Sequence, residues 1–181
     1  MTTKGERTKQ HILQQSLLLF SKNSFKNVTM RQIAKEANVS PALIYKYFPT
    51  QEELYYATMQ TASHELLEKL QSNDTLEDIV DAYLEHMLTT EVLFEIMAYF
   101  SLDRDQAEND LPILDEVNQF LTLLEPKISS THAKIEAQLL FSTLNGLIIS
   151  YKKIPHRNIE TKIEAVKKLA HYYVSHLKQR I

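Results

Sequence analysis

Only two glycines, Gly5 and Gly146, occur in the 181 residues of this chain, together with five prolines. Hairpins and tight turns depend on these residue types, so few positions remain where a strand could reverse its direction. Apolar residues instead recur every three or four positions along most of the sequence, which is the spacing of one helical face. These features predict an all-α protein of about nine helices.

Composition narrows the class of protein further. Cysteine is absent, which excludes disulfides and thiolate metal sites and agrees with a reducing compartment. The apolar run at 17–20 is too short for a signal peptide, and the run at 139–149 is too short to span a membrane. The sequence therefore predicts a cytoplasmic protein without a membrane partner, and no residue pattern predicts a cofactor or a metal.

Charge is distributed unevenly, although the net charge is only −3. Residues 1–50 carry eight Lys or Arg against two Glu, residues 73–125 carry one Arg against fourteen acids, and residues 126–181 carry ten basic against three acidic residues. A basic head on an acidic chain is typical of a protein that meets a polyanion. A solvated charge bias without any partner would give the same pattern.

Two pairs of residues have the spacing of a capping box, in which two side chains satisfy backbone N–H groups at a helix start. Thr29 with Gln32 predicts a short helix that ends near residue 37, and Thr50 with Glu53 predicts a long helix to about residue 70. Further helices are expected after Thr75, at about 91–102, from about 110 to 126, at 133–151 and at 159–177.

The segment between the first two capping boxes predicts a tight turn. Asn38 is, after glycine, the residue type that best tolerates the positive φ such a break requires. Ser40 and Pro41 are preferred at the N-cap and at the first helical position, so a helix is expected at 41–47. A long helix, a short helix, a turn and a second short helix form the helix-turn-helix arrangement, whose last helix enters the DNA major groove.

The stretch at 12–54 resembles the DNA-binding domain of TetR-family transcriptional regulators. The matching positions are Phe20, Phe25, Val28, Thr29, Ile33, Ala34, Ala37, Val39, Ser40, Tyr45, the aromatic Tyr47, Phe48, Glu53 and Leu54. Three positions depart from the family pattern, since Ser24 and Asn38 replace glycine and Gln51 replaces lysine. The resemblance implies a helix-turn-helix domain at 1–49 and a helical effector-binding and dimerisation domain at 50–181.

The resemblance also implies which residues contact DNA, namely Thr29, Met30, Arg31, Ser40, Pro41, Ala42, Tyr45, Lys46, Tyr47 and Gln51. The backbone of Thr29 or Met30 and the Tyr45 side chain would meet phosphates, and Arg31 would reach a guanine or a phosphate. Gln51 would keep a donor without the charge of lysine. The alternatives are surface packing for Tyr45 and a solvated ion pair for Arg31.

Two other groups in this domain are expected from the residues themselves. Its core is expected to consist of Phe20, Phe25, Ile33, Ala34, Val39, Ile44 and Phe48. The basic residues Lys4, Arg7 and Lys9 either contact phosphates or belong to a disordered arm.

One helix-turn-helix offers little contact surface, so a homodimer on a palindromic DNA operator is expected. The resemblance implies a four-helix bundle made from the last two helices of each subunit. Its candidate interface residues are Ala137, Leu140, Leu144, Ile148, Val166, Ala170, Tyr173 and Leu177. The same residues can also belong to the core of the protomer. We expect both roles, with one face of each helix pointing inward and another at the interface.

Large and adaptable side chains between residues 75 and 125 are candidates for an effector cavity. They are Tyr83, Met87, Phe94, Met97, Phe100 and Phe120, with Tyr99 beside them, and a plain core role is the alternative. The acidic block suits either a cationic, lipophilic ligand or a solvated face that keeps DNA away; the second is preferred.

Together these features predict a DNA-binding regulator, a repressor that a small-molecule effector releases by shifting a conformational equilibrium. The alternatives are an all-helical enzyme and a protein-interaction module that does not bind DNA. A di-metal helical oxidase requires Glu-x-x-His pairs, and no Glu here is followed by His three residues later. No catalytic residue is therefore predicted, and an interaction module leaves the basic head unexplained.

Overall fold

The computed structural model describes residues 3–20, 22–23, 27–90, 93–94, 114–152, 154–155 and 157–177. Within these residues the chain forms eight α-helices, one short 3-10 helix and no strand, so the all-α prediction is confirmed. The helix predicted at 91–102 lies outside the described residues except for Leu93 and Phe94, which are helical and buried.

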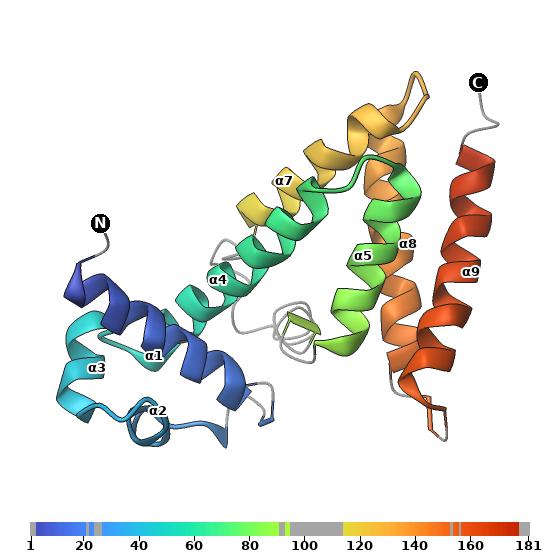
Figure 1. The fold of residues 1–181 in the computed structure, drawn as a ribbon. Helices are drawn as coiled ribbons and strands as arrows, with labels where there is room; N and C mark the ends of the chain where they lie inside the picture. Colours follow the sequence, from blue (N-terminus) through green and yellow to red (C-terminus); the bar gives the residue numbers. More distant parts are fainter. Residues whose placement is uncertain are drawn as a thin grey trace. The chain divides into compact units, whose positions relative to one another are not determined.

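The helices begin and end close to the predicted positions (Figure 1). They are α1 (Lys4–Phe20), α2 (Met30–Glu36), α3 (Pro41–Tyr47), α4 (Gln51–Gln71), α5 (Leu76–Thr89), α7 (Leu114–Leu124), the 3-10 helix η3 (Glu125–Lys127), α8 (Ala133–Lys152) and α9 (Ile159–Leu177). The helix expected to reach Pro126 ends at Leu124 as an α-helix. Pro126 lacks the N–H that a further α-helical turn would need, and it lies in η3 instead.

The chain divides into two compact units, and each is described by itself. Among the described residues, the first unit comprises 3–63 with Leu93 and Phe94, and the second comprises 64–90 and 114–177. The boundary falls inside α4. The division at 49/50 concerns functional domains and stays a prediction.

The core of the first unit joins α1, α2, α3 and the start of α4. Ile12, Ile33, Ile44 and Leu54, one from each of these helices, are fully shielded from solvent. Burial of one such aliphatic side chain contributes about 1.5–3 kcal/mol to stability. Of the seven expected core residues, the structure buries Phe20, Ile33, Ala34, Ile44 and Phe48, leaves Val39 partly exposed, and does not describe Phe25.

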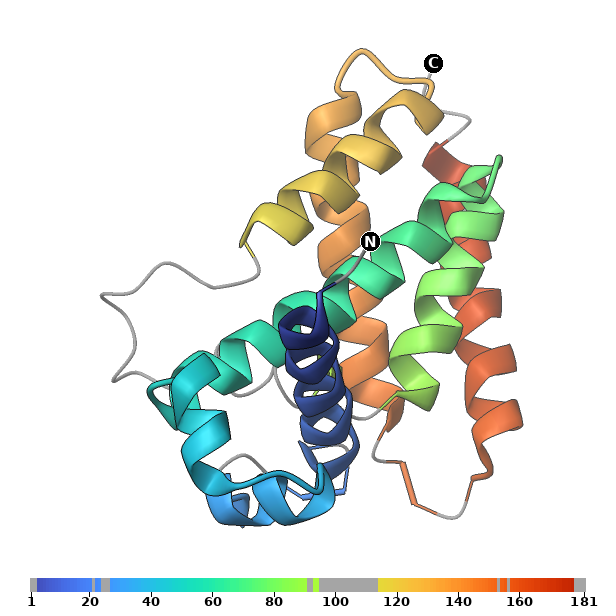
Figure 2. The same ribbon diagram turned by 60° about the vertical axis from the view of Figure 1, so that its left-hand side comes forward.

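The second unit is built on α5, α8 and α9, which lie side by side (Figure 1). Their inner faces carry Ile79, Val80, Tyr83, Leu84 and Met87, then Ala137, Leu140, Leu144 and Ile148, then Val166, Ala170, Val174 and Leu177. The spacing of three and four places each set on one side of its helix. Figure 2 shows α7 and α8, in yellow and orange, joined by a loop, with α7 inclined to α8 and running in the opposite sense.

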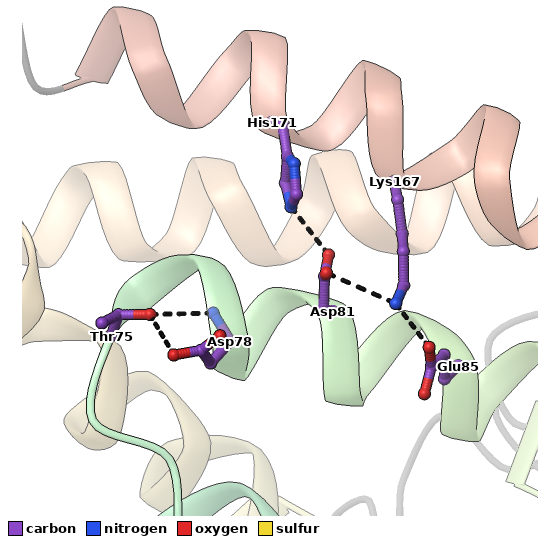
Figure 3. Close-up of polar contacts among 6 residues, drawn as sticks. All are labelled: Thr75, Asp78, Asp81, Glu85, Lys167 and His171. Atoms are coloured by element: carbon purple, nitrogen blue, oxygen red, sulfur yellow. Dashed lines mark hydrogen bonds and ion pairs between the residues drawn. The ribbon is translucent and has the colours of Figure 1, made fainter.

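Acidic side chains of α5 pair with basic side chains of α9 (Figure 3). The Asp81 carboxylate accepts from Lys167 Nζ at 3.3 Å and from His171 Nε2 at 2.7 Å, and Lys167 also pairs with Glu85. Burial acts to lower the pKa of Lys167, but the two carboxylates outweigh it and raise that pKa above its ordinary value. Part of the basic C-terminal block therefore balances the acidic block inside this unit.

Side chains also satisfy the helix ends of this unit. The Thr75 hydroxyl accepts the backbone N–H of Asp78 at 3.1 Å, which confirms the predicted N-cap (Figure 3). Lys152 Nζ donates to the Thr90 carbonyl oxygen, just past α5, at 3.1 Å. Lys162 Nζ donates to the Lys152 carbonyl oxygen at 2.8 Å. Cations at helix C-termini match the negative end of the helix dipole, so these lysines stabilise the bundle.

His86 on α5 is half-buried and lies near the positive charges of Lys69 and Lys152. Burial lowers the pKa of His86, and the charges of Lys69 and Lys152 lower it further. Because the folded protein resists protonation of His86, stability present above the ordinary pKa of 6.5 should be lost as the pH falls toward the lower folded-state value. Urea denaturation should show a larger loss between about pH 7 and pH 5 in the wild type than in His86→Gln. Equal losses would contradict this assignment.

Candidate nucleic-acid interface

α2 begins at a complete capping box. The Thr29 hydroxyl accepts the backbone N–H of Gln32 at 3.3 Å, and the Gln32 side-chain oxygen accepts the backbone N–H of Thr29 at 2.8 Å. This confirmed box fixes the first turn so that Met30 is buried and Arg31 is exposed. Arg31 therefore offers its side chain to a partner, while Met30 can do so only through its backbone.

The turn between α2 and α3 has the geometry expected from its sequence. Asn38 has a φ of 52°, the one positive value among the described non-glycine residues. The Ser40 hydroxyl accepts the backbone N–H of Leu43 at 3.2 Å, and Pro41 is the first residue of α3. The predictions for Asn38, Ser40 and Pro41 are confirmed, and together these three residues set the direction in which α3 leaves the turn.

α3 turns one side to the core and the other to solvent. Ile44 is fully buried, whereas Tyr45 is 51% exposed. We call the exposed side the outer face of α3, and it consists of Ser40, Pro41, Ala42, Tyr45 and Lys46. Small residues at its start allow another backbone to approach closely, and the hydroxyl and ammonium groups at its end are suited to bind phosphate.

Tyr47 differs from Tyr45 because it is partly covered by α1. A Cβ built on Gly5 would lie 3.4 Å from the Tyr47 hydroxyl oxygen, so the two residues are neighbours. Lys9 Nζ lies 5.5 Å from the centroid of the Phe48 ring, which is a cation–π distance. The start of α1 therefore packs against the end of α3, and only part of the Tyr47 side chain is accessible.

The basic residues at the N-terminus are helical. Lys4, Arg7 and Lys9 lie within α1, so the disordered-arm alternative is wrong from Lys4 onward. Glu6 Oε2 accepts the backbone N–H of Thr3 at 2.5 Å, and the Thr3 hydroxyl accepts the backbone N–H of Glu6 at 3.2 Å. Sequence reasoning missed this capping box, although the Thr-x-x-Glu spacing was available as a signal.

Two side chains form hydrogen bonds between the helix-turn-helix and the neighbouring helices α1 and α4. Gln51 Nε2, at the start of α4, donates to the Val28 carbonyl oxygen at 2.6 Å. His11 Nε2, on α1, lies 3.1 Å from the Ala37 carbonyl oxygen and can approach it only as a donor. One N–H of the Gln51 amide is thus used inside the protein, and its phosphate contact stays a prediction. No sequence signal marked His11.

Four of the residues expected to line an effector cavity are buried. The structure buries Tyr83, Met87, Phe94 and Phe120, while Met97, Tyr99 and Phe100 lie outside the described residues. Tyr83 stacks on Phe120 with ring centroids 4.8 Å apart, and its hydroxyl donates to Asn145 Oδ1 at 2.8 Å. Burial raises the pKa of Tyr83 far above its ordinary value.

An open groove of about 610 Å³ lies between the end of α4 and α7 in the second unit. Gln71, Asn118, Gln119 and Thr122 supply amides and a hydroxyl to its walls. None of the four described candidates, Tyr83, Met87, Phe94 and Phe120, is among the residues that line it. Tyr83, Met87 and Phe120 therefore belong to the core of the second unit, and the groove had no sequence signal.

The stripe expected at the dimer interface lies inside the protomer. At most 2% of the side chain is exposed for Ala137, Leu140, Leu144, Ile148, Val166, Ala170 and Leu177, and Tyr173 is partly exposed. Seven of the eight are therefore already covered by their own chain and cannot be the surface that a second copy covers. The large apolar residues that α8 and α9 do expose are Ile135, Leu139, Ile149, Ile159, Leu169 and Tyr172. The correction has a simple reason, since both sides of these helices repeat at three and four and periodicity alone does not say which side faces inward.

The sequence is similar to a known family and to known proteins. Residues 12–58 match the family described as bacterial regulatory proteins, tetR family. The chain is similar to nucleoid occlusion factor SlmA of Shewanella baltica, with 27% identity over 131 residues, which are 72% of this chain and 63% of that protein. The chain thus spans less than two thirds of the length of these curated relatives.

Solved structures share the fold over most of the chain. The reduced form of NemR from E. coli has a TM-score of 0.70 at 18% identity and covers 91% of this chain and 96% of its own. A TetR-family transcriptional regulator from Pectobacterium atrosepticum has a TM-score of 0.73 at 13% identity, covering 96% and 95%. In the described residues, no helix has the length and apolarity to cross a membrane, and no three potential metal ligands gather.

Proposed function

We propose that this chain, whose residues 12–58 match the tetR family of bacterial regulatory proteins, is a homodimeric, sequence-specific DNA-binding regulator of transcription, a repressor released by a small-molecule effector. The outer face of α3, held by the Asn38 turn, is the observation that carries the proposal. Two copies related by a two-fold axis read a palindromic operator. The regulators of this family are not enzymes, in agreement with the sequence, and such a regulator acts in the cytoplasm.

DNA contacts are divided between the start of α2 and the outer face of α3. Ala42 lets the start of α3 approach base edges, while Tyr45 and Lys46 bind phosphates on either side of the groove. Arg31, exposed in the first turn of α2, reads a guanine, the base for which arginine has the best bidentate geometry. Tyr47 and Gln51 contribute less, because Tyr47 is partly covered by α1 and an N–H of Gln51 is engaged by Val28.

The second copy covers the outer face of α8. Ile135, Leu139, Ser142, Gly146 and Ile149 are all exposed and recur at spacings of three and four, so they share one side of the helix. This side of α8 carries large apolar residues at both ends and the small residues Ser142 and Gly146 in the middle. Nothing lies within 4 Å of a Cβ built on Gly146, which leaves space for another helix to approach.

α9, which packs against α8, also exposes large apolar residues. Leu169 and Tyr172 are exposed to 42% and 69%, three residues apart on this helix. Pairing of α8 and α9 with the same two helices of a second copy would bury these side chains in a four-helix bundle. An isologous contact of this kind closes after two subunits, which is the symmetry that a palindrome requires.

Effector release follows from a shift between two conformers. α4 contains residues of both units, with Gln51 tied to Val28 at its start and Gln71 beside the groove at its end. An effector that binds one conformer more tightly would change the separation of the two DNA-reading faces through this helix. An effector with equal affinity for both conformers would change nothing.

Arg31→Ala and Tyr45→Phe should separate base reading from phosphate binding. An operator is first selected from random duplexes, and binding is then measured by fluorescence anisotropy. We expect Arg31→Ala to cost about 1–3 kcal/mol and to relax preference at one position of each half-site, because a lost bidentate contact acts at one base. Tyr45→Phe should weaken binding to every sequence.

Lys69→Ala is the matched control, since it removes one exposed cation from the second unit without touching the first unit or the exposed sides of α8 and α9. Its operator affinity should equal that of the wild type, and wild-type affinity should fall steeply with salt. Equal losses of Arg31→Ala on operator and random DNA would remove its reading role. Failure of the wild type to enrich any sequence would refute the proposed function.

A further inference from the structure

The polar cluster around Asn145 has unused capacity to accept hydrogen bonds. The Tyr83 hydroxyl donates to Asn145 Oδ1 at 2.8 Å, and Asn145 Nδ2 donates to the Phe141 carbonyl oxygen at 3.0 Å. The Tyr83 hydroxyl oxygen and Asn145 Oδ1 can each accept one hydrogen bond more. Because Tyr83 is 3% exposed, water has little access to this region.

Glu116 on α7 adds a carboxylate at the same end of the α7–α8 pair. The Phe120 and Phe141 rings meet edge-on, with centroids 5.9 Å apart, between α7 and α8, which run in opposite senses. Glu116 lies one helical turn before Phe120, and Asn145 lies one turn after Phe141, so both positions lie beyond this contact on the same side. Glu116 Oε2 is shut off from solvent and has no hydrogen-bond partner.

A buried carboxylate oxygen without a partner is costly, and native proteins rarely keep one that nothing uses. The rings of Tyr83, Phe120 and Phe141 pack against one another with centroids within 6.4 Å and make the surroundings of this cluster aromatic. Carboxylate and hydroxyl oxygens accept N–H groups, and aromatic faces attract cations. A positively charged donor on an apolar body satisfies all of these groups.

The same chemistry favours an organic cation over a metal ion. No group of three His, Asp or Glu side chains gathers in the described part of the chain, so the charge and the ligands that a divalent metal requires are missing there. An ammonium group needs one carboxylate and a few neutral acceptors.

We propose that Glu116 anchors a protonated organic amine, and that lipophilic amines are the effector class of this regulator. The proposal rests on the function proposed above and names the chemistry of its effector. The ammonium group donates to Glu116 Oε2, and the apolar body lies against the aromatic rings. Glu116, Tyr83 and Asn145 belong to α7, α5 and α8, so the bound amine links three helices of the second unit and stabilises one arrangement of them.

Phenylbutylamine tests the charge requirement against phenylbutanol and phenylbutyrate, which have the same apolar body. We expect the amine alone to raise the melting temperature of the full-length protein and to give measurable heat in calorimetry. Glu116→Gln should weaken amine binding by about tenfold or more, the usual value of a charge-assisted hydrogen bond. Asp115→Asn, which removes the exposed acid beside Glu116, should bind the amine as the wild type does. Equal binding of the amine and the alcohol, or no effect of Glu116→Gln, would overturn the proposal.

The amine-free melting temperature of Glu116→Gln gives a second readout. It should be unchanged or higher, because the substitution removes a carboxylate whose shielded Oε2 has no hydrogen-bond partner. A decrease of several degrees would show that Glu116 has a structural partner, and it would overturn the proposal. Operator binding of the amine-free variant should match the wild type. A wild-type protein that binds amine but no DNA would refute the proposed function and leave the amine site standing.

Discussion

Gly146→Phe should convert the protein to a monomer and lower its operator affinity by about 100-fold or more, because two linked half-site contacts become one. Gly146 lies in the middle of the exposed side of α8, and nothing lies within 4 Å of an added Cβ. The protomer can therefore accommodate the phenyl ring, while a second copy cannot approach. Light scattering should give 21.0 kDa, the mass of one chain, instead of twice that value.

Gly146→Ala is the matched control for this substitution. Its methyl group is small, and alanine is favoured over glycine inside a helix by about 1 kcal/mol, so the protomer should become more stable. We expect the dimer to persist at micromolar concentration. If Gly146→Phe also remains dimeric with unchanged operator affinity, the interface lies elsewhere.

Asn38→Val should destabilise the first unit by about 1–2 kcal/mol relative to Asn38→Gly, which is the cost of placing a β-branched residue in the left-handed region. Asn38 has a φ of 52° and sets the direction of α3. Operator binding should fall with the population of the correct turn. Urea denaturation, with the helical signal and operator binding followed together, measures both effects.

Asn38→Gly serves as the comparison, since glycine adopts this φ without strain. It should equal or exceed the wild type in stability and keep operator affinity. Similar behaviour of Asn38→Val and Asn38→Gly would mean that the turn does not depend on the residue at this position, and that α3 is oriented by its core contacts alone.

Features decided over a few residues could be predicted from the sequence. The Thr29 capping box, the positive φ of Asn38 and the N-cap at Ser40 all depend on interactions that span at most three residues. Residue type alone restricts such positions, because few side chains can cap a helix or adopt a left-handed backbone. The bounds of α3 followed from these local preferences and from Pro49.

Features decided between distant segments could not be predicted. Leu144 and Ile149 both belong to regular apolar patterns, yet Leu144 is buried and Ile149 is 59% exposed. Only the packing of α8 against α5 and α9 separates the two sides. The hydrogen bond from Gln51 to the Val28 carbonyl oxygen and the contact of His11 with Ala37 likewise join segments more than twenty residues apart. Amide and imidazole side chains occur in so many roles that their type alone predicts none of them.

The lysines that donate to carbonyl oxygens at helix C-termini should react slowly with amine-directed reagents. Lys152 and Lys162 hold their ammonium groups on backbone carbonyl oxygens, and this slows attack of the amine on an acylating reagent. Lys134 and Lys168 are exposed next to Ile135 and Leu169. An amine-directed cross-linker should therefore react at Lys134 and Lys168 in preference to Lys152 and Lys162, and a link between copies at these two positions would give a product of two chains.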